Sequence, residues 1–159
     1  MKTLVIYYSY SGNTKMAAEV IAKTLHADIE ELQPIKPLNA SGAGYVAWGL
    51  RQLVSTSKPP LKPLVHNPQE YDLIVIGTPV WSYTYTPPVR TFFETISLKG
   101  KKIALFCSHG GDPRKTLDKM ADCLSGNDVI GKIDFCDPLK TGAEQNKKKA
   151  VNWANSLKK

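Results

Sequence analysis

The stretch TLVIYYSYSGNTK, residues 3–15, decides the fold. Its first half is a continuous apolar and β-branched run, which is typical of a strand buried on both faces of a sheet. Its second half is a short loop of hydroxyl and amide side chains around Gly12. The apolar side chains that follow have the spacing of one helical face: Ala17, Val20, Ile21 and Leu25. The stretch therefore predicts a strand, a polar turn and a helix in direct succession.

The same succession recurs along the chain. We expect strands at residues 3–8, 28–33, 71–77, 102–107 and 133–136. Further helices should begin at Pro87, at Asp112–Pro113 and at the capping-box sequence Thr141-Gly-Ala-Glu144. Strands that alternate with helices through right-handed crossovers predict a three-layer α/β fold, a five-stranded parallel sheet in the order 2-1-3-4-5 with helices on both faces. We expect a single domain over residues 1–159, with an irregular insertion at 34–69 that contains a short helix near 45–54.

Composition limits the classes of partner. The chain has 21 Lys and Arg against 14 Asp and Glu, a net charge of +7 that could favour an anionic partner. The lysines gather at 99–102, 147–149 and 158–159 without interleaved aromatic side chains, so we expect solvated faces and no nucleic-acid binding. Three cysteines without a C-x-x-C pair lie in apolar stretches and are expected to be buried free thiols. No apolar run approaches membrane-spanning length, and we expect a cytoplasmic protein.

Three loops follow strands that end at one edge of the predicted sheet. In this fold a ligand binds outside the carboxyl ends of the strands. The candidate ligand-binding loops are therefore residues 9–14, 78–87 and 108–112. The first loop opens a helix, so its unpaired backbone N–H groups and its hydroxyl groups suit an anion such as a phosphate. Ordinary capping and turn formation would explain the same residue types. The loop has neither the P-loop pattern nor the dinucleotide fingerprint.

Three motifs together resemble the flavodoxin family, in its short flavodoxin-like branch. They are Ser9-Tyr-Ser-Gly-Asn-Thr14, Gly77-Thr-Pro-Val-Trp81 and Pro87-Pro-Val-Arg-Thr-Phe-Phe-Glu94, and the resemblance spans essentially the whole chain. It implies non-covalently bound FMN and a function in electron transfer to a redox partner protein or a small-molecule acceptor.

The resemblance also implies the residues that would hold the cofactor. The phosphate would be held by Ser9, Tyr10, Ser11, Gly12, Asn13 and Thr14. One side of the ring would be lined by Thr78, Pro79, Val80, Trp81 and Ser82, with Trp81 as the stacking residue. The pyrimidine edge of the ring would meet Ser108, His109, Gly110, Gly111 and Asp112.

The chain departs from the family pattern in charge and in its third loop. Electron-carrier flavodoxins are strongly acidic, whereas this chain is basic, and its third loop lacks an aromatic residue for the second face of the ring. Either His109, Tyr45 or Trp48 covers that face, or the face is open. An open face would suit an alternative function, an FMN-dependent NAD(P)H:quinone-type oxidoreductase. Tyr83 and Tyr85 are equally consistent with a lid, a ring contact or plain surface.

Other classes fit the residues less well. A cofactor-free interaction domain would leave the three loops without a ligand. The stretch from Cys107 to Arg114 has one residue too many for a phosphatase loop, and Pro113 lacks the amide donor that such a loop needs. No acidic pair of a response regulator follows the first strand. His26, His66 and His109 have no partners at metal-ligand spacing, so we expect no metal. The sequence names no catalytic acid or base and no oligomeric state.

Overall fold

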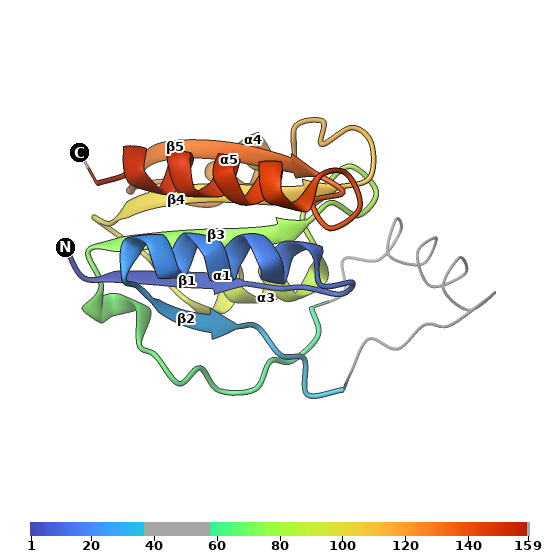
Figure 1. The fold of residues 1–159 in the computed structure, drawn as a ribbon. Coiled ribbons are helices and arrows are strands. Elements are labelled where there is room, and N and C mark those ends of the chain that lie inside the picture. The colour runs from blue at the N-terminus through green and yellow to red at the C-terminus, as the bar shows by residue number, and fades with distance from the viewer. Residues whose placement is uncertain (37–57, 159) are drawn as a thin grey trace.

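The computed structural model describes residues 1–36 and 58–158, which form a three-layer α/β fold (Figure 1). The strands are β1 (Thr3–Tyr7), β2 (Asp28–Glu31), β3 (Leu73–Pro79), β4 (Lys102–His109) and β5 (Asp128–Cys136). The helices are α1 (Asn13–Leu25), α3 (Pro87–Thr95), α4 (Thr116–Asp122) and α5 (Ala143–Ser156), with a 3-10 turn η1 at Pro68–Glu70. All strand pairs are parallel, and the order β2-β1-β3-β4-β5 confirms the prediction. The expected helix near 45–54 lies outside the described residues.

The sheet separates two apolar layers. Helices α1 and α5 lie side by side on one face, and α3 and α4 cover the other (Figure 1). Successive side chains of β1 alternate between these layers, with Leu4 and Ile6 toward α3 and Val5 toward α1. All three are fully buried, and each such side chain stabilises the fold by about 1.5–3 kcal/mol. The continuous apolar runs in the sequence reflect this burial on both faces.

One glycine in the sheet, Gly77, allows close packing between β3 and β4 just below the carboxyl edge. Gly77 in β3 pairs with Phe106 in β4, and a Cβ atom at Gly77 would lie 2.0 Å from the Phe106 ring. Only glycine lets the ring lie across this strand, directly below the loop that begins at Thr78.

Two helix starts differ from the prediction. Helix α4 begins at Thr116 because the Asp112 carboxylate accepts a hydrogen bond from the Arg114 N–H (2.8 Å) and holds residues 112–114 in a turn. The predicted capping box before α5 is wrong, since the helix has no side-chain cap. Gly142 is the N-cap residue at φ 77°, and the Glu144 carboxylate binds Lys147 (2.7 Å) instead.

Strand β5 and two cysteines also differ. The strand begins at Asp128, five residues before the predicted start, because an edge strand with partly exposed side chains lacks a continuous apolar run. Cys107 is buried as expected, and burial raises the pKa of its thiol to about 12. Cys123 and Cys136 are exposed, so the expectation of three buried thiols is wrong for two of them.

Candidate functional site

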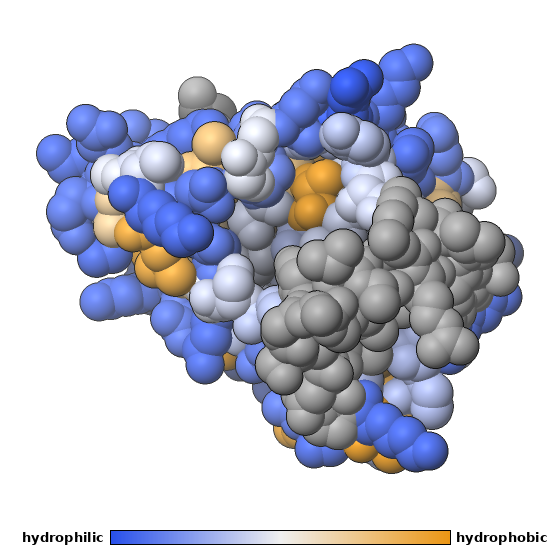
Figure 2. Space-filling model, turned by 90° about the vertical axis from the view of Figure 1, so that its right-hand side faces the viewer, coloured by the Kyte–Doolittle hydropathy of each residue, from blue (hydrophilic) through white to orange (hydrophobic). Residues whose placement is uncertain are grey.

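The carboxyl ends of β1, β3, β4 and β5 meet at one edge of the sheet, on the right in Figure 1. Figure 2 looks onto this edge and shows an apolar patch set back among neutral and polar side chains. The three loops singled out in the sequence leave the sheet here, so the structure brings them together as predicted.

The first loop is a braced turn that ends at the N-terminus of α1. Gly12 is the N-cap residue in the left-handed region (φ 89°) and has no side chain to cap the helix. The Asn13 side chain donates to Ser11 Oγ (3.1 Å), and the Lys15 N–H donates to Ser9 Oγ (3.2 Å). Both serine oxygens therefore act as acceptors within the loop, and their O–H groups remain available to a ligand. The first-turn N–H of Lys15 is therefore satisfied by Ser9, whereas the N–H groups of Asn13 and Thr14 have no partner within the helix and suit an anion.

A buried hydrogen bond connects the first loop to the third. Thr14 Oγ1 and Ser108 Oγ lie 2.6 Å apart, and both residues are buried. One of the two hydroxyl protons is used in this bond, so the pair has one proton left for a ligand. Thr14 and Ser108 therefore fix the distance between the two loops.

The second loop contains a strained hairpin turn. Trp81 and Thr84 exchange backbone hydrogen bonds (3.0 and 3.1 Å), and the residues between them, Ser82 and Tyr83, have φ values of 52° and 61°. Positive φ at both central positions is the geometry of a type I′ turn, which normally requires glycine or asparagine. Each residue held in this conformation costs about 1–3 kcal/mol, a strain that often marks a ligand site.

The turn presents Trp81 beside two tyrosines. The Trp81 ring is half-buried and lies edge-on to Tyr8 (5.7 Å between centroids) and to Tyr10 (5.8 Å). Tyr10 is 40% exposed, so it and Trp81 form an aromatic wall between the first and second loops. Such a wall suits a flat aromatic ligand.

Other residues of the second loop have structural partners. The Thr78 hydroxyl is fully buried and accepts the Thr86 N–H (3.1 Å), which closes the base of the loop. The Val80 N–H donates to the Ser108 carbonyl (2.8 Å) and holds the loop against β4. Pro79 ends β3 and, like Val80, is partly buried. The side chain of Thr78 is therefore part of the framework beneath the site.

The two tyrosines that the sequence left equivalent take different places. Tyr83 is 54% exposed, and the Arg114 guanidinium lies 4.8 Å from the centre of its ring. Tyr85 packs against Phe93 (5.4 Å), and its hydroxyl lies 3.2 Å from Cys123 Sγ. Burial, together with the Cys123 contact, raises the pKa of Tyr85 to about 12. Tyr83 stays at the rim of the site, whereas Tyr85 belongs to the packing of α3 and α4.

His109 is a buried residue rather than the loop residue that the sequence suggested. It ends β4, and its side chain is only 5% exposed. Its Nε2 atom lies 3.0 Å from Asp134 Oδ2 on β5, while Nδ1 is buried without a hydrogen-bond partner among the described residues. Partial burial would raise the pKa of Asp134, but the His109 hydrogen bond and the Lys149 charge outweigh burial and lower it. A buried ring nitrogen without a partner among the described residues, at the carboxyl end of β4, fits a ligand that supplies the missing hydrogen bond.

The rest of the third loop offers backbone rather than side chains. No atom of the described residues beyond the chain neighbours lies within 4 Å of the position that a Cβ would take at Gly111, which suits close approach of a ligand. Both Asp112 oxygens interact with Arg114, through its N–H (2.8 Å) and its Nε (2.9 Å). The Asp112 carboxylate therefore stabilises the turn through its bonds to Arg114. The backbone of Gly110 and Gly111 is the part of this loop that suits contact with the edge of a ligand.

The sequence prediction missed a fourth loop and a residue of β5. The Leu139 N–H donates to Asn13 Oδ1 (3.1 Å), and the Asp137 N–H donates to the His109 carbonyl (2.7 Å). Residues 137–142 therefore brace both the first loop and the end of β4. Their position after the carboxyl end of β5 was the available signal, because all parallel strands end at the same edge. The pairing of His109 with Asp134 had no signal in the sequence.

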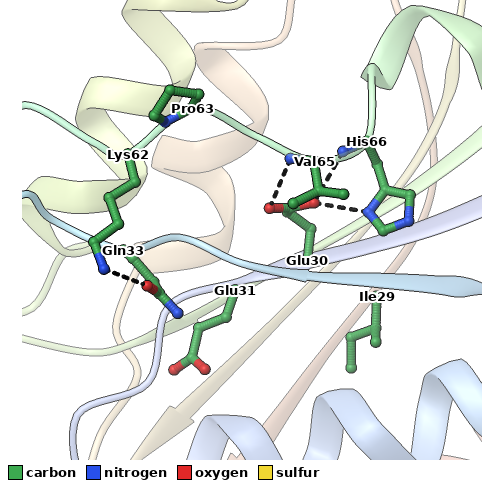
Figure 3. Close-up of a pocket in the computed structure, with 8 residues that line it drawn as sticks. All are labelled: Ile29, Glu30, Glu31, Gln33, Lys62, Pro63, Val65 and His66. Atoms are coloured by element: carbon green, nitrogen blue, oxygen red, sulfur yellow. Dashed lines mark hydrogen bonds and ion pairs between the residues drawn. The ribbon is translucent and has the colours of Figure 1, made fainter.

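Two cavities lie away from this edge of the sheet. One, of about 300 Å³, lies between β2 and residues 62–66 (Figure 3). Here the buried Glu30 carboxylate accepts the N–H groups of Val65 (3.2 Å) and His66 (3.1 Å) and lies 2.7 Å from His66 Nδ1. The other, of about 350 Å³, lies between residues 60–64 and α3. With its hydrogen bonds satisfied, Glu30 holds residues 65–66 on the sheet and needs no ligand.

Within residues 1–36 and 58–158, no three His, Cys, Asp or Glu side chains are arranged to hold a metal ion. Over those same ranges no helix is long and apolar enough to span a bilayer.

Comparison with known proteins gives a consistent result. The family model described as Flavodoxin matches residues 2–153. A flavodoxin of Maridesulfovibrio salexigens is 21% identical, over 98% of this chain and 96% of its own length. A flavoprotein of Lactobacillus acidophilus solved in complex with FMN has a TM-score of 0.70 and 27% identity, covering 91% of this chain and 98% of its own. A putative flavoprotein of Bacteroides uniformis has a TM-score of 0.78 and 25% identity, covering 99% and 98% of the two chains.

Proposed function

The chain belongs to the flavodoxin family, and from this premise we propose that it binds FMN and transfers electrons between redox partners. The observation that carries the proposal is the first loop, in which the Asn13 and Thr14 N–H groups at the start of α1, a left-handed Gly12 and the serine O–H groups lie together. A phosphate monoester has a charge of about −1.5 to −2 and three strong acceptor oxygens, and this loop offers the matching donors.

We assign the phosphate to the loop that begins at Ser9. The Ser9 and Ser11 hydroxyls and the first-turn N–H groups would donate to it, and Gly12 would let the backbone approach closely. Thr14 shares its hydroxyl with Ser108, so it contributes mainly by fixing the third loop against the first. The residues of this phosphate site are Ser9, Tyr10, Ser11, Gly12, Asn13 and Thr14.

We assign the flavin ring to the space between the second and third loops. Trp81 and Tyr10 would provide the aromatic wall, and the strained turn at Ser82 would hold Trp81 in place. The backbone of Gly110 and Gly111, together with the unpartnered Nδ1 of His109, would meet the polar edge of the ring. Bound FMN supplies the redox chemistry itself, while these residues bind it, orient it and exclude water. The remaining assigned residues are Thr78, Pro79, Val80, Ser108 and Asp112.

The partner of the redox reaction is either a protein or a small-molecule acceptor. Electron transfer between proteins needs only an accessible edge of the flavin. Tyr10 and Tyr83 lie exposed at the rim of the site and would leave such an edge open to a partner protein. A quinone-type reductase would in addition need a free ring face, and the third loop brings no aromatic side chain to cover one. We place this FMN-binding domain, formed by residues 1–159, in the cytoplasm.

The test is a comparison of FMN with riboflavin, which has the same ring but lacks the phosphate. The purified chain should acquire a flavin absorption band with FMN, quench the fluorescence of FMN, and bind riboflavin at least about a hundredfold more weakly. Equal affinity for the two flavins would refute the phosphate assignment, and binding of neither would refute the function. Oxidation of NADH or NADPH by the holoprotein with a quinone present would favour the reductase over the carrier.

A further inference from the structure

The positive charge of the chain is unevenly distributed between its two helical layers. Helices α1 and α5 together contain five lysines and two glutamates, an excess of three positive charges. Helices α3 and α4 contain two basic and three acidic residues, an excess of one negative charge. Because α1 and α5 lie side by side on one face of the sheet, the lysines that the sequence placed on separate helices share one surface.

We call this surface the α1/α5 face, formed by the outward side chains of α1 and α5 and by the flanking Lys140 and Lys158. The end of the face next to the first loop contains four lysines: Lys15, Lys140, Lys147 and Lys148. Only Lys147 is neutralised, by Glu144 at 2.7 Å. Among the described residues Lys15, Lys140 and Lys148 are exposed and form no ion pair, so their charge is free to attract an anionic surface.

On this distribution of charge we propose that the α1/α5 face is the docking surface for a redox protein with an acidic surface. The inference rests on the proposed function, because it places the partner next to the FMN phosphate loop. A bound FMN phosphate removes at most about two of the seven net positive charges, so the holoprotein stays basic. Complementary charge of this kind raises the rate of association and selects the partner more than it adds affinity.

The surface favours a protein over a nucleic acid as its partner. The lysines on the face have no arginine among them, and the one aromatic ring of α5, Trp153, lies partly buried against Phe106 (6.5 Å). A nucleic-acid surface would be expected to present arginines and exposed stacking rings. The ammonium groups of lysines on a polar helix surface are sufficient to attract a protein surface that is rich in carboxylates.

The test uses two haem proteins of opposite charge as probes, acidic cytochrome b5 and basic cytochrome c. The reduced holoprotein is mixed with each oxidised probe, so electrons pass from flavin to haem iron, and the rate is followed by stopped flow at increasing ionic strength. Electrostatic steering predicts a bimolecular rate constant about tenfold or more higher for cytochrome b5 at low salt, falling as salt is added. A higher rate constant for cytochrome c, or no salt dependence with cytochrome b5, would overturn the proposal.

A pair of double variants locates the surface. Lys140→Glu with Lys148→Glu reverses two free lysines on the α1/α5 face. Lys99→Glu with Lys102→Glu makes the same change of charge at exposed lysines near the amino ends of the strands. The first variant should lower the cytochrome b5 rate constant about tenfold at low salt, and the second should lower it no more than about twofold. Equal effects would show that only net charge matters and would overturn the assignment to this face.

Failure of the proposed function would give a different result. A chain that acquires no flavin band cannot be reduced, but its binding to immobilised cytochrome b5 can still be measured. Salt-sensitive binding that is weakened by the first double variant alone would support the docking surface without FMN. Absence of binding by the wild-type chain at low salt would refute it.

Discussion

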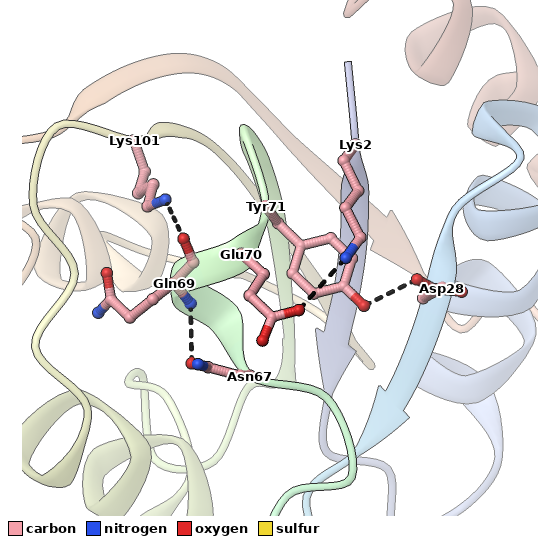
Figure 4. Close-up of polar contacts among 7 residues, drawn as sticks. All are labelled: Lys2, Asp28, Asn67, Gln69, Glu70, Tyr71 and Lys101. Atoms are coloured by element: carbon pink, nitrogen blue, oxygen red, sulfur yellow. Dashed lines mark hydrogen bonds and ion pairs between the residues drawn. The ribbon is translucent and has the colours of Figure 1, made fainter.

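The two ends of the sheet differ in how completely their polar groups are paired. At the amino end the polar groups bind one another (Figure 4). The Lys2 N–H donates to Asp72 (2.7 Å), the Tyr71 hydroxyl donates to Asp28 (2.7 Å), and the Lys101 ammonium donates to the Gln69 carbonyl (2.6 Å). At the carboxyl end polar groups also bind one another, but the first two N–H groups of α1 have no partner within the helix, and His109 Nδ1 has no partner among the described residues.

This difference separates stability from function within one fold. When the polar groups at one end of the sheet hydrogen-bond to one another, they stabilise the fold and leave few donors or acceptors for a ligand. An end with uncapped amides, a strained turn and an orphaned ring nitrogen is less stable than the fold would allow, and a ligand can recover that loss on binding. Substitutions of the groups that face the ligand at the carboxyl end should therefore change FMN affinity, and those at the amino end should change only the free energy of unfolding.

The largest effect is expected from Gly12→Asp. Aspartate tolerates the left-handed conformation better than most residues, and its Cβ would lie 3.5 Å from Leu139 Cδ1, so the fold should survive. The carboxylate would face the phosphate, and like charges in such contact cost several kcal/mol, which predicts roughly a thousandfold loss of FMN affinity. Titration of FMN fluorescence measures the change.

Gly12→Asn is the matched control, since it has nearly the same shape without the charge. We expect it to weaken FMN binding about tenfold, from the side chain's bulk alone. An aspartate variant that binds FMN as well as the asparagine variant would remove the phosphate from this loop.

The second largest effect is expected from Trp81→Ala, which removes the larger ring of the aromatic wall. Loss of this apolar surface should cost about 2 kcal/mol, or roughly a thirtyfold weaker affinity for FMN. Trp81→Phe keeps a ring and should lose less than half of that free energy. Because the phosphate site is untouched, riboflavin and FMN should be weakened by the same factor, and a selective loss of FMN binding would contradict the assignment.

The sequence was sufficient for features that depend on burial and chain order. The apolar runs in β1, β3 and β4 identified buried strands, and the strand order placed the first three loops at one edge. Periodicity could not predict contacts between distant residues, such as His109 with Asp134 across a sheet whose β4–β5 register shifts at Ile103/Ala104. Nor could turn propensities predict the hairpin at Ser82 and Tyr83, since neither residue favours positive φ.

A third prediction tests the amino end through Tyr71→Phe. The change removes the hydrogen bond from the Tyr71 hydroxyl to the exposed Asp28 carboxylate and leaves the buried ring in place. Urea unfolding should show a loss of about 1 kcal/mol in the free energy of unfolding. FMN affinity should stay within about twofold of wild type. A larger change in affinity would mean that the two ends of the sheet are coupled.

The smallest effect is expected from Asp134→Asn, and it depends on pH. The pKa of Asp134 is lowered in the folded chain, so the folded state binds this proton less readily than the unfolded state does. Its contribution to stability is therefore present above the unfolded pKa of about 3.9 and is lost as the pH falls through the lowered value. The asparagine keeps an acceptor for His109 but loses the charge that attracts Lys149.

Urea unfolding should therefore show a gap of a few tenths of a kcal/mol between the free energies of unfolding of wild type and Asp134→Asn at neutral pH. This gap should close in acid, once the pH has fallen through the lowered pKa of Asp134. Asp122→Asn, at an exposed carboxylate without a hydrogen-bond partner among the described residues, should show no gap at either pH. A gap that persists in acid would mean that the asparagine disturbs the geometry around His109 rather than its electrostatics. In that case FMN affinity should fall as well, because the strand end that supports the third loop would have moved.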